Sequence, residues 1–333
     1  MSESLSAVIL AAGKSTRTYP ITLNTPKGLL KVLNKPILQR TLDELIGLVQ
    51  RVYIIVGYKK EMIQHAFGSH YEGIELIYIE QKEVTGTGSA ILQLKGVIQG
   101  KFLVLNGDDL YKKEDIRELL KYPYGVLAQK VSDPSRFGVF QMDSQGKLLN
   151  IIEKPKENIG NLVNTGCYLF DEKIFEYILQ KSPRGEYEIT DYLLYLAQQY
   201  GVQVVPVKKY WVALGYSWDL LKANQFVLKY DFGEEKRESD IPEHVSVTGS
   251  VSIGSKVIFG KNVQLFGPIV IGNEVRINDN AYILPYTVIE NDVVVDEECM
   301  IADSLITDHS FLHRDAKRRG AIVTSKYTIT MNT

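Results

Sequence analysis

The apolar positions of the first 230 or so residues follow two alternating patterns, short continuous runs and stripes at helical spacing. Such runs predict buried strands, and the stripes between them predict amphipathic helices. The runs lie at Leu5–Leu10, Val52–Val56, Ile74–Ile79 and Phe102–Leu105, and the clearest stripes lie at Pro36–Val49 and Asp219–Tyr230. This alternation predicts an α/β fold whose mainly parallel sheet is covered on both faces. Ligands of such sheets bind beyond the carboxyl ends of the strands.

The stretch that begins at Phe137 departs from this alternation. Its strand-like pieces have no helical stripe between them, and they are Phe137–Met142, Leu148–Ile152 and Val163–Phe170. We therefore expect an antiparallel insertion at the edge of the sheet. Helical stripes return at Glu172–Gln180 and at Glu188–Gln199.

The apolar period changes to six after the polar, charged segment Asp231–Asp240. Eleven apolar lead positions recur every sixth residue from Ile241 to Ile301, and a second apolar or small series follows four residues after each lead. This spacing is typical of a hexapeptide β-helix, in which three hexapeptides form a turn and stacked turns bury the leads. Eleven units predict between three and four turns. We expect three parts, a domain over 1–230, a linker over 231–240, and the repeats with a C-terminal tail over 241–333.

Composition excludes several classes of protein. The formal net charge of −2 gives no electrostatic footprint for nucleic acid. No apolar run approaches the roughly 20 residues that span a bilayer, so we expect no membrane association. The cysteines, Cys167 and Cys299, have neither metal-ligand spacing nor a disulfide pattern, which favours a cytoplasmic location.

A loop of small residues, Ala11, Ala12 and Gly13, follows the first predicted strand. Such a loop lets backbone N–H groups approach phosphate oxygens. The triplet that begins at Gly13 is not a Walker A loop, because Val8 stands where that motif needs a glycine. A plain strand-to-helix turn is the alternative interpretation of the loop.

The continuation of this loop carries a family resemblance. Arg17 ends the run A-A-G-K-S-T-R, and Lys27 lies in T-P-K-G ten residues later. The segment resembles the signature loop of sugar-1-phosphate nucleotidylyltransferases, from which it departs at Ser15 and Gly28. The resemblance implies a Rossmann-like nucleotidyltransferase domain with a mixed, mainly parallel sheet. It also implies that Arg17 and Lys27 hold the triphosphate and the forming pyrophosphate.

Further blocks of the family follow in order. Gln81 with Gly86 and Thr87 resembles the block that reads the base, and a glutamine amide pairs with the edge of a pyrimidine. Asp108, in N-G-D-D after a predicted strand, matches the family's ligand for Mg²⁺. Asp109 could instead only cap the next turn.

Segments of the predicted insertion resemble those that surround the sugar in the family. Gly138 lies in F-G-V, Glu153 and Lys154 in E-K-P, and Asn164 in N-T-G-C-Y. By this resemblance Glu153 accepts hydrogen bonds from sugar hydroxyls and Asn164 bridges two of them. Lys154 neutralises the sugar phosphate.

The ordered blocks indicate an enzyme that transfers a nucleotidyl group from UTP or dTTP to glucose 1-phosphate or N-acetylglucosamine 1-phosphate. Pyrophosphate is the second product. A weakened homologue that only binds nucleotide sugars is an alternative, because Ala213 stands where the family commonly has its second metal-binding aspartate.

A branch of the family shares the left-handed β-helix, and flat β-helix faces often associate, so we expect a homo-oligomer. Some β-helices also transfer acyl groups from coenzyme A. Here His309 and His313, expected just past the repeats, are weak evidence for that second activity.

Overall fold

The computed structural model describes residues 5–157 and 159–330 and divides into two compact units. The first unit comprises the chain up to Ser15 with Thr25–Leu29 and Ile37–Ala213, and the second comprises Thr16–Asn24, Leu30–Pro36 and the chain from Leu214 onward. The boundaries that the sequence suggests, with a linker over 231–240, stay a prediction. No helix within the described ranges has both the length and the apolar character to cross a membrane.

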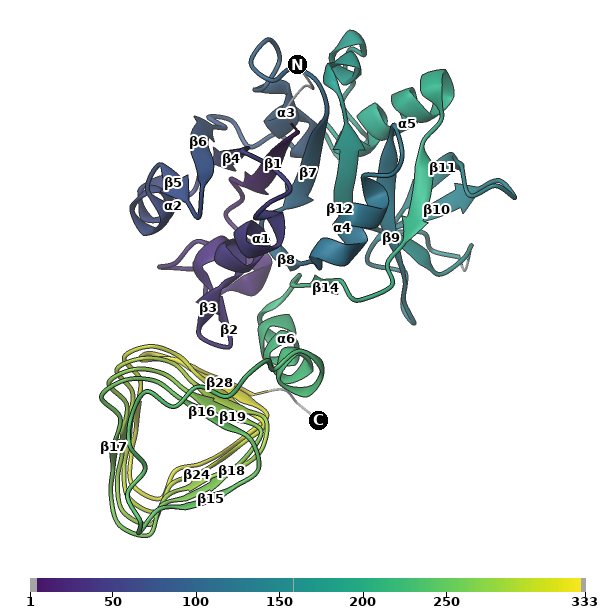
Figure 1. Cartoon of the computed structure of the whole chain (residues 1–333). Coiled ribbons are helices and arrows are strands. Elements are labelled where there is room, and N and C mark those ends of the chain that lie inside the picture. The colour runs from purple at the N-terminus through teal and green to yellow at the C-terminus, as the bar shows by residue number, and fades with distance from the viewer. Residues whose placement is uncertain (1–4, 158, 331–333) are drawn as a thin grey trace. The chain divides into compact units, whose positions relative to one another are not determined.

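The first unit is built on a ten-stranded mixed sheet with a parallel centre (Figure 1). Its main path runs β11-β10-β12-β7-β1-β4-β6-β5, with β9 beside β12 and β13 beside β9. The strands are β1 (Ser6–Ala11), β4 (Arg51–Val56), β5 (His70–Tyr71), β6 (Ile74–Glu80), β7 (Phe102–Asn106), β9 (Gly125–Lys130), β10 (Gly138–Met142), β11 (Leu148–Glu153), β12 (Leu162–Phe170) and β13 (Gln203–Pro206). The four strands predicted from continuous apolar runs, β1, β4, β6 and β7, form the parallel centre.

Two hydrophobic cores cover the two faces of this sheet. Along β1, Val8 lies in one core while Ala7 and Ile9 lie in the other, because successive side chains of a strand point to opposite faces. Helices α1 (Ile37–Leu45), α2 (Lys60–Phe67) and α4 (Lys113–Leu119) contribute to the core of Ala7 and Ile9. Helices α3 (Thr87–Leu92) and α5 (Ile189–Tyr200) contribute to the other. The predicted cover on both faces is therefore confirmed.

Two expectations about this unit are wrong in detail. The third strand of the insertion, β12, lies inside the sheet, where it pairs antiparallel with β7, and only β10 and β11 extend to the edge. The helix expected over Glu172–Gln180 is a 3₁₀ turn over Glu172–Glu176. The chain becomes extended at Tyr177, whose ring packs edge-on against Tyr192 with the ring centroids 6.4 Å apart.

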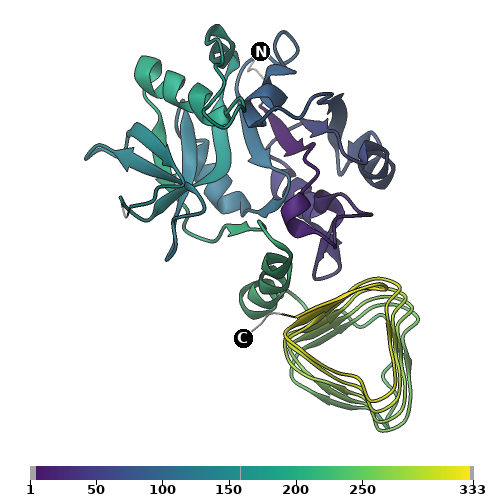
Figure 2. The same cartoon turned by 180° about the vertical axis from the view of Figure 1, so that it is seen from behind.

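Residues 241–323 of the second unit form a left-handed parallel β-helix with a triangular cross-section (Figures 1 and 2). The chain then turns back and pairs antiparallel with the last strand of the second sheet. Its first sheet is β15 (Ser246–Thr248), β18 (Gln264–Phe266), β21 (Tyr282–Ile283), β24 (Met300–Ala302) and β27 (Lys317–Arg319). The second is β16 (Val251–Ile253), β19 (Ile269–Ile271), β22 (Thr287–Ile289), β25 (Leu305–Ile306), β28 (Ala321–Val323) and β29 (Thr328–Thr330). The third is β17 (Ile258–Phe259), β20 (Arg276–Ile277), β23 (Val294–Val295) and β26 (Phe311–Leu312).

The coil is longer than three to four turns, because its first sheet stacks five strands. Ser246 pairs with Gln264, 18 residues on, but Met300 pairs with Lys317, only 17 residues on. One residue is missing from the turn around Asp303, so a strict period of six ends there while buried leads continue at Ile306 and Leu312. His309 and His313 consequently lie within the coil rather than past it. His309 occupies a left-handed corner, where its Nδ1 lies 2.6 Å from Asp292 Oδ2.

The end of the segment predicted as a linker pairs with the first turn of the coil. The Glu238 amide donates to the carbonyl of Ile253 at 2.9 Å, and the Ile253 amide donates to the carbonyl of Lys236 at 2.7 Å. These bonds give the first coil a hydrogen-bonded neighbour on its open side.

The second unit also contains a small hairpin and a long helix. The hairpin is β2 (Lys31–Val32) and β3 (Lys35–Pro36), joined by Leu33 and Asn34, both with positive φ as a tight two-residue turn requires. The helix is α6 (Ser217–Tyr230), which begins two residues before its predicted start.

Glu290 is a buried carboxylate in a column of glycines. Gly254 and Gly272 occupy the equivalent position, directly after a lead residue, in the two preceding turns of the β-helix. A Cβ on Gly272 would lie 2.8 Å from the Glu290 backbone. The Glu290 side chain bonds the Asp308 amide at 3.0 Å and is 5% exposed. Burial raises its pKa to about 7, the charge of Asp308 adds to this, and Lys31 opposes it.

We predict that Glu290→Gln changes how the stability of this unit depends on pH. Since the folded-state pKa of about 7 exceeds the 4.5 of an exposed glutamate, the stabilisation is complete below about pH 4.5 and is lost as pH rises through 7. This difference between the two pKa values corresponds to at most about 3 kcal/mol in the free energy of unfolding. Glutamine stays neutral and keeps the bond to Asp308. The melting temperature of the variant should therefore equal that of wild type at pH 5 and exceed it at pH 9.

Thermal unfolding followed by circular dichroism checks this expectation. Glu274→Gln is the matched control, because Glu274 is exposed on the same coil and pairs only at the surface with Lys256 at 2.6 Å. Parallel melting curves of Glu290→Gln and wild type across this pH range would contradict a protonated Glu290.

Candidate active site

The carboxyl ends of two neighbouring strands bring together loops that are far apart in sequence. β1 pairs in parallel with β7, so Leu10 lies opposite Asn106 and the chain after each strand emerges at the same edge. The Gly107 amide donates to the carbonyl of Leu10 at 2.9 Å. A Cβ on Gly107 would lie 2.8 Å from that carbonyl oxygen, so the close approach requires glycine. The small-residue loop of Ala11, Ala12 and Gly13 therefore begins beside the segment N-G-D-D, which contains Asp108.

Lys27 and Asp108 form an ion pair at this edge. Lys27 lies in a 3₁₀ turn over Lys27–Leu29, and its Nζ donates to Asp108 Oδ2 at 2.5 Å. The lysine is 7% exposed and the aspartate 38%. A buried ammonium needs such a partner, because leaving its charge unpaired is costly. The structure therefore joins two of the predicted catalytic residues, which are 81 positions apart.

Asp109 is buried immediately beside this pair. Its Oδ2 accepts from Asn106 Nδ2 and from Trp211 Nε1, each at 3.2 Å. Burial and the charge of Asp108 raise its pKa to about 7. Asp109 belongs to β8 (Asp109–Leu110), which shows that it does more than cap a turn. The contact with Trp211 was not anticipated, although Trp211 opens the same sequence block as Ala213.

Ala213 lies directly opposite Asp109. It belongs to β14 (Val212–Ala213), which pairs antiparallel with β8. Its methyl group offers no ligand for a metal. Over 5–157 and 159–330, no three histidine, cysteine or acidic side chains gather as a metal site. One partly exposed carboxylate, Asp108, still suits a divalent cation whose other ligands are phosphate oxygens and water.

The block predicted to read the base is held by a compact network around Gln81. Gln81 Nε2 donates to the carbonyl of Gly86 at 3.0 Å and to Ser89 Oγ at 2.8 Å, and the side chain is buried. Both amide hydrogens are therefore used inside the protein, which the sequence did not reveal. The hydroxyl of Thr87 accepts from the Ile189 amide at 3.1 Å, so that side chain fixes the start of α5.

Gly86 is required where the chain turns into α3. Its φ is +118°, and a Cβ there would lie 2.3 Å from the carbonyl oxygen of Tyr187. That carbonyl accepts from the Gly88 amide at 2.8 Å. The glycines of this block therefore bring α3 against the segment before α5.

The residues expected around a sugar lie on β10, β11 and β12. Gly138 is the register partner of Glu153, whose carboxylate lies 3.7 Å from Lys154 and 3.8 Å from Arg184. Arg184, which sequence reasoning missed, also binds Glu188 at 2.9 Å.

Asn164 is more constrained than expected. Its Nδ2 donates to the Tyr168 hydroxyl at 2.7 Å and its Oδ1 accepts from the Gly166 amide at 2.9 Å. Gly166, with φ +74°, passes so close to Asn106 that a Cβ would lie 2.1 Å from Asn106 Nδ2. The irregular part of β12 therefore reaches the same edge as Asp108, while the amide of Asn164 is largely committed to the fold.

Arg17 belongs to the second unit, where it lies in a 3₁₀ turn over Thr16–Thr18. Its guanidinium carbon lies 5.8 Å from the ring centroid of Tyr216. The Ser217 hydroxyl donates to the carbonyl of Tyr19 at 3.1 Å. Arg17 is thus held against the N-terminal end of α6.

Known proteins resemble this chain over the same region. A family model described as "Nucleotidyl transferase" matches residues 6–230. The "Bifunctional protein GlmU" of Methanocaldococcus jannaschii is 39% identical over 251 residues, which cover 75% of this chain and 60% of that protein. The chain therefore spans about 60% of the length of this relative.

Two further similarities cover nearly the whole of the other protein. The "UTP--glucose-1-phosphate uridylyltransferase AglF" of Haloferax volcanii is 33% identical over 66% of this chain and 96% of its own. A solved structure of UDP-glucose pyrophosphorylase complexed with UDP-glucose matches with a TM-score of 0.62 and 25% identity, over 68% of this chain and 99% of that chain.

We predict that Ala213→Asp strengthens binding of a divalent cation. The new carboxylate would face the strand that follows Asp108 and could complete a two-carboxylate site. A ligand that contributes about 1.4 kcal/mol lowers the dissociation constant about tenfold. Titration of Mn²⁺ by electron paramagnetic resonance, with a non-hydrolysable nucleoside triphosphate present, measures this constant.

Ala213→Asn is the matched control, because asparagine fills the same space without a charge. Equal Mn²⁺ affinity of the aspartate and asparagine variants would contradict a ligand role for position 213.

Proposed function

Because this chain belongs to the nucleotidyl transferase family, we propose that it transfers a nucleotidyl group from UTP or dTTP to a sugar 1-phosphate, with release of pyrophosphate. Glucose 1-phosphate and N-acetylglucosamine 1-phosphate are the acceptors we favour. The observation that carries the proposal is the Lys27–Asp108 pair at 2.5 Å, at the strand ends where the small-residue loop begins. A lysine and a carboxylate beside a loop of small residues suit a triphosphate with its cation.

The proposed reaction is a direct displacement. An oxygen of the sugar phosphate attacks the α-phosphorus, a new P–O bond forms, and the bond from the α-phosphorus to the bridging oxygen breaks. The electron pair leaves with pyrophosphate. Catalysis of such a step is mainly positioning and charge neutralisation. Lys27 neutralises the phosphates from within the first unit, and Arg17 is the second cation assigned to them.

Asp108 would hold a magnesium ion together with phosphate oxygens. That ion, when bound, supplies positive charge against the oxygens of the triphosphate. The ammonium of Lys27 already orients the Asp108 carboxylate, which fixes one ligand before substrate arrives. Glu153 and Lys154, beside Arg184, are the polar groups assigned to the sugar and its phosphate.

The geometry of Gln81 supports a uracil or thymine base. Both hydrogens of its amide are used by Gly86 and Ser89, so the group has only its carbonyl oxygen to offer a ligand. An acceptor matches the N3–H donor of uracil and thymine, whereas N3 of cytosine is itself an acceptor. The orientation of one buried amide therefore favours UTP and dTTP over CTP.

A catalytically weakened homologue is the second candidate function, and Ala213 is the observation that favours it. Acyl transfer by the β-helix has less support. His309 bonds Asp292 at a corner of the coil, and acidic or amide residues occupy most of the equivalent left-handed corners. The corner therefore accounts for His309 without a catalytic role.

We predict that Lys27→Ala lowers kcat for pyrophosphate release about 10²-fold or more, because one charge that stabilises the transition state is lost. Arg17→Ala should have an effect of the same order. A coupled assay with UTP, dTTP and several sugar 1-phosphates measures these rates. Arg51→Ala is the control, since it breaks an exposed ion pair with Glu75 of 2.7 Å at the opposite end of the sheet. Near-normal turnover of Lys27→Ala would refute its assignment.

We also predict that Gln81→Leu lowers the preference for UTP over CTP by about tenfold or more, because the acceptor for the base is removed. The ratio of kcat/KM for the two nucleotides measures this preference. Gln93→Leu is the control, because Gln93 donates to the carbonyl of Ser89 at 3.1 Å on the same helix segment. An unchanged ratio in Gln81→Leu would show that another group reads the base.

A further inference from the structure

Two acidic side chains of successive coils converge on one lysine of the β2–β3 hairpin. Lys31 Nζ donates to Asp308 Oδ2 and lies 3.9 Å from Glu290 Oε2. The coil orients both acids, because the Asp308 amide donates to Glu290 and Asp308 Oδ1 accepts from the Asn291 amide at 2.9 Å. Lys31 is 18% exposed. Breaking such an ion pair leaves a poorly solvated charge, so the contact is a strong anchor for the hairpin.

Nothing in the repeat itself requires an acid at position 308. Asn273 and Asn291 stand at the position of Asp308 in the two preceding coils, and each accepts from the backbone amide of its neighbouring coil. Asparagine therefore satisfies the coil as well as aspartate does. The negative charge of Asp308 is explained by Lys31.

The turn of the hairpin has further anchors. Asn34 Nδ2 donates to the carbonyl of Ile289 in the β-helix at 3.1 Å. The buried Asn224 of α6 accepts from the Leu33 amide at 2.9 Å and donates to the carbonyl of Lys31 at 3.4 Å. The hairpin therefore links the coil to the middle of α6.

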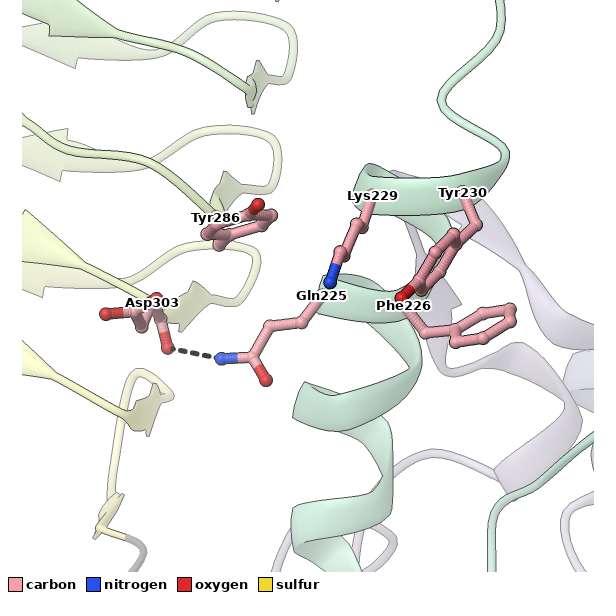
Figure 3. Close-up of a pocket in the computed structure, with 6 residues that line it drawn as sticks. All are labelled: Gln225, Phe226, Lys229, Tyr230, Tyr286 and Asp303. Atoms are coloured by element: carbon pink, nitrogen blue, oxygen red, sulfur yellow. Dashed lines mark hydrogen bonds between the residues drawn. The ribbon is translucent and has the colours of Figure 1, made fainter.

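The C-terminal half of α6 meets the coil directly. Gln225 Nε2 donates to the carbonyl of Asp303 at 3.3 Å, as Figure 3 shows. Around this bond lies an open pocket of about 320 Å³, lined by Gln225, Phe226, Lys229, Tyr230, Tyr286 and Asp303. Helix α6 also contacts β28 of the β-helix directly, so the hairpin is one of its connections to the coil.

The N-terminal end of α6 holds the segment that contains Arg17. The Tyr216 ring lies under the Arg17 guanidinium and stacks on Trp218 with centroids 4.7 Å apart and planes 5° apart. Asp219 fixes this end, since its Oδ2 accepts from the amides of Gly215 and Tyr216, each at 2.9 Å. Contacts thus run without a gap from the acids of the coil to Arg17.

From these contacts we infer that the β-helix positions Arg17 for catalysis, through Lys31 of the hairpin and Asn224 of α6. Asp308, Glu290 and Lys31 are positioning residues, and none of them touches substrate. The inference rests on the proposed function, in which Arg17 binds the triphosphate. In sequence, Lys27 lies between the two stretches that this network holds, Thr16–Asn24 and Leu30–Pro36.

Asp308→Asn in the full-length chain is the sharpest test, because asparagine keeps the bond within the coil and removes only the charge that Lys31 meets. We expect kcat/KM for the nucleotide to fall about tenfold, with little change in KM for the sugar phosphate. In an Arg17→Ala background, Asp308→Asn should not lower kcat/KM for the nucleotide any further, since a residue that acts through Arg17 has no effect without it. Lys31→Met should reproduce both results.

Lys256→Met is the control, because Lys256 pairs with Glu274 on the exposed face of the coil. An equal loss in the wild-type and Arg17→Ala backgrounds, or no loss while wild type turns over, would overturn the inference. Hydrogen–deuterium exchange gives a readout independent of turnover, since Asp308→Asn must speed amide exchange over residues 16–24. Unchanged exchange overturns the inference even if wild type is inactive, whereas inactivity alone would count against the proposed function.

Discussion

The parallel pairing of β1 with β7 is the constraint on which the candidate site depends. It ends both strands at one edge, so the small-residue loop and Asp108 emerge side by side. Gly107 makes this possible, because any side chain there would meet the carbonyl of Leu10. Asp108 in turn gives the buried ammonium of Lys27 its partner. One strand register therefore assembles the small-residue loop, a carboxylate and a lysine from distant parts of the chain.

Charged side chains lie close together at this edge of the sheet. Their burial and mutual repulsion are unfavourable, and the surrounding polar groups reduce this free-energy cost. Asp109 lies behind Asp108 with a raised pKa, and the amide of Asn106 and the indole of Trp211 hold its carboxyl group. A neutral carboxyl group there avoids placing a second buried negative charge beside the first. Ala213, opposite Asp109, leaves Asp108 as the carboxylate assigned to a cation. The electrostatics thus suit a cation held largely by the phosphates of a substrate.

The β-helix obeys a different constraint, the stacking of equivalent positions every 18 residues. Positions that follow the leads crowd the next coil, which is why Gly254 and Gly272 stand there. Asp308 departs from what the coil needs, since asparagine serves at the same position in the two preceding turns, and Lys31 explains its charge. A repeat chosen for self-stacking has thus acquired a small acidic site for a segment outside the repeat.

The sequence by itself determined the periods of the two regions, and with them the parallel sheet and the coil, because burial follows apolar spacing. It also indicated, through the family resemblance, the short motifs to which we assign the chemistry. The missing residue near Asp303, the place of β12 inside the sheet and the commitment of the Gln81 amide depended on tertiary structure. So did the partners of Asp109 and Lys31, since pairs more than 80 positions apart leave no periodic trace in the chain. Local pattern fixes which face of an element is buried, but only packing decides which side chains meet.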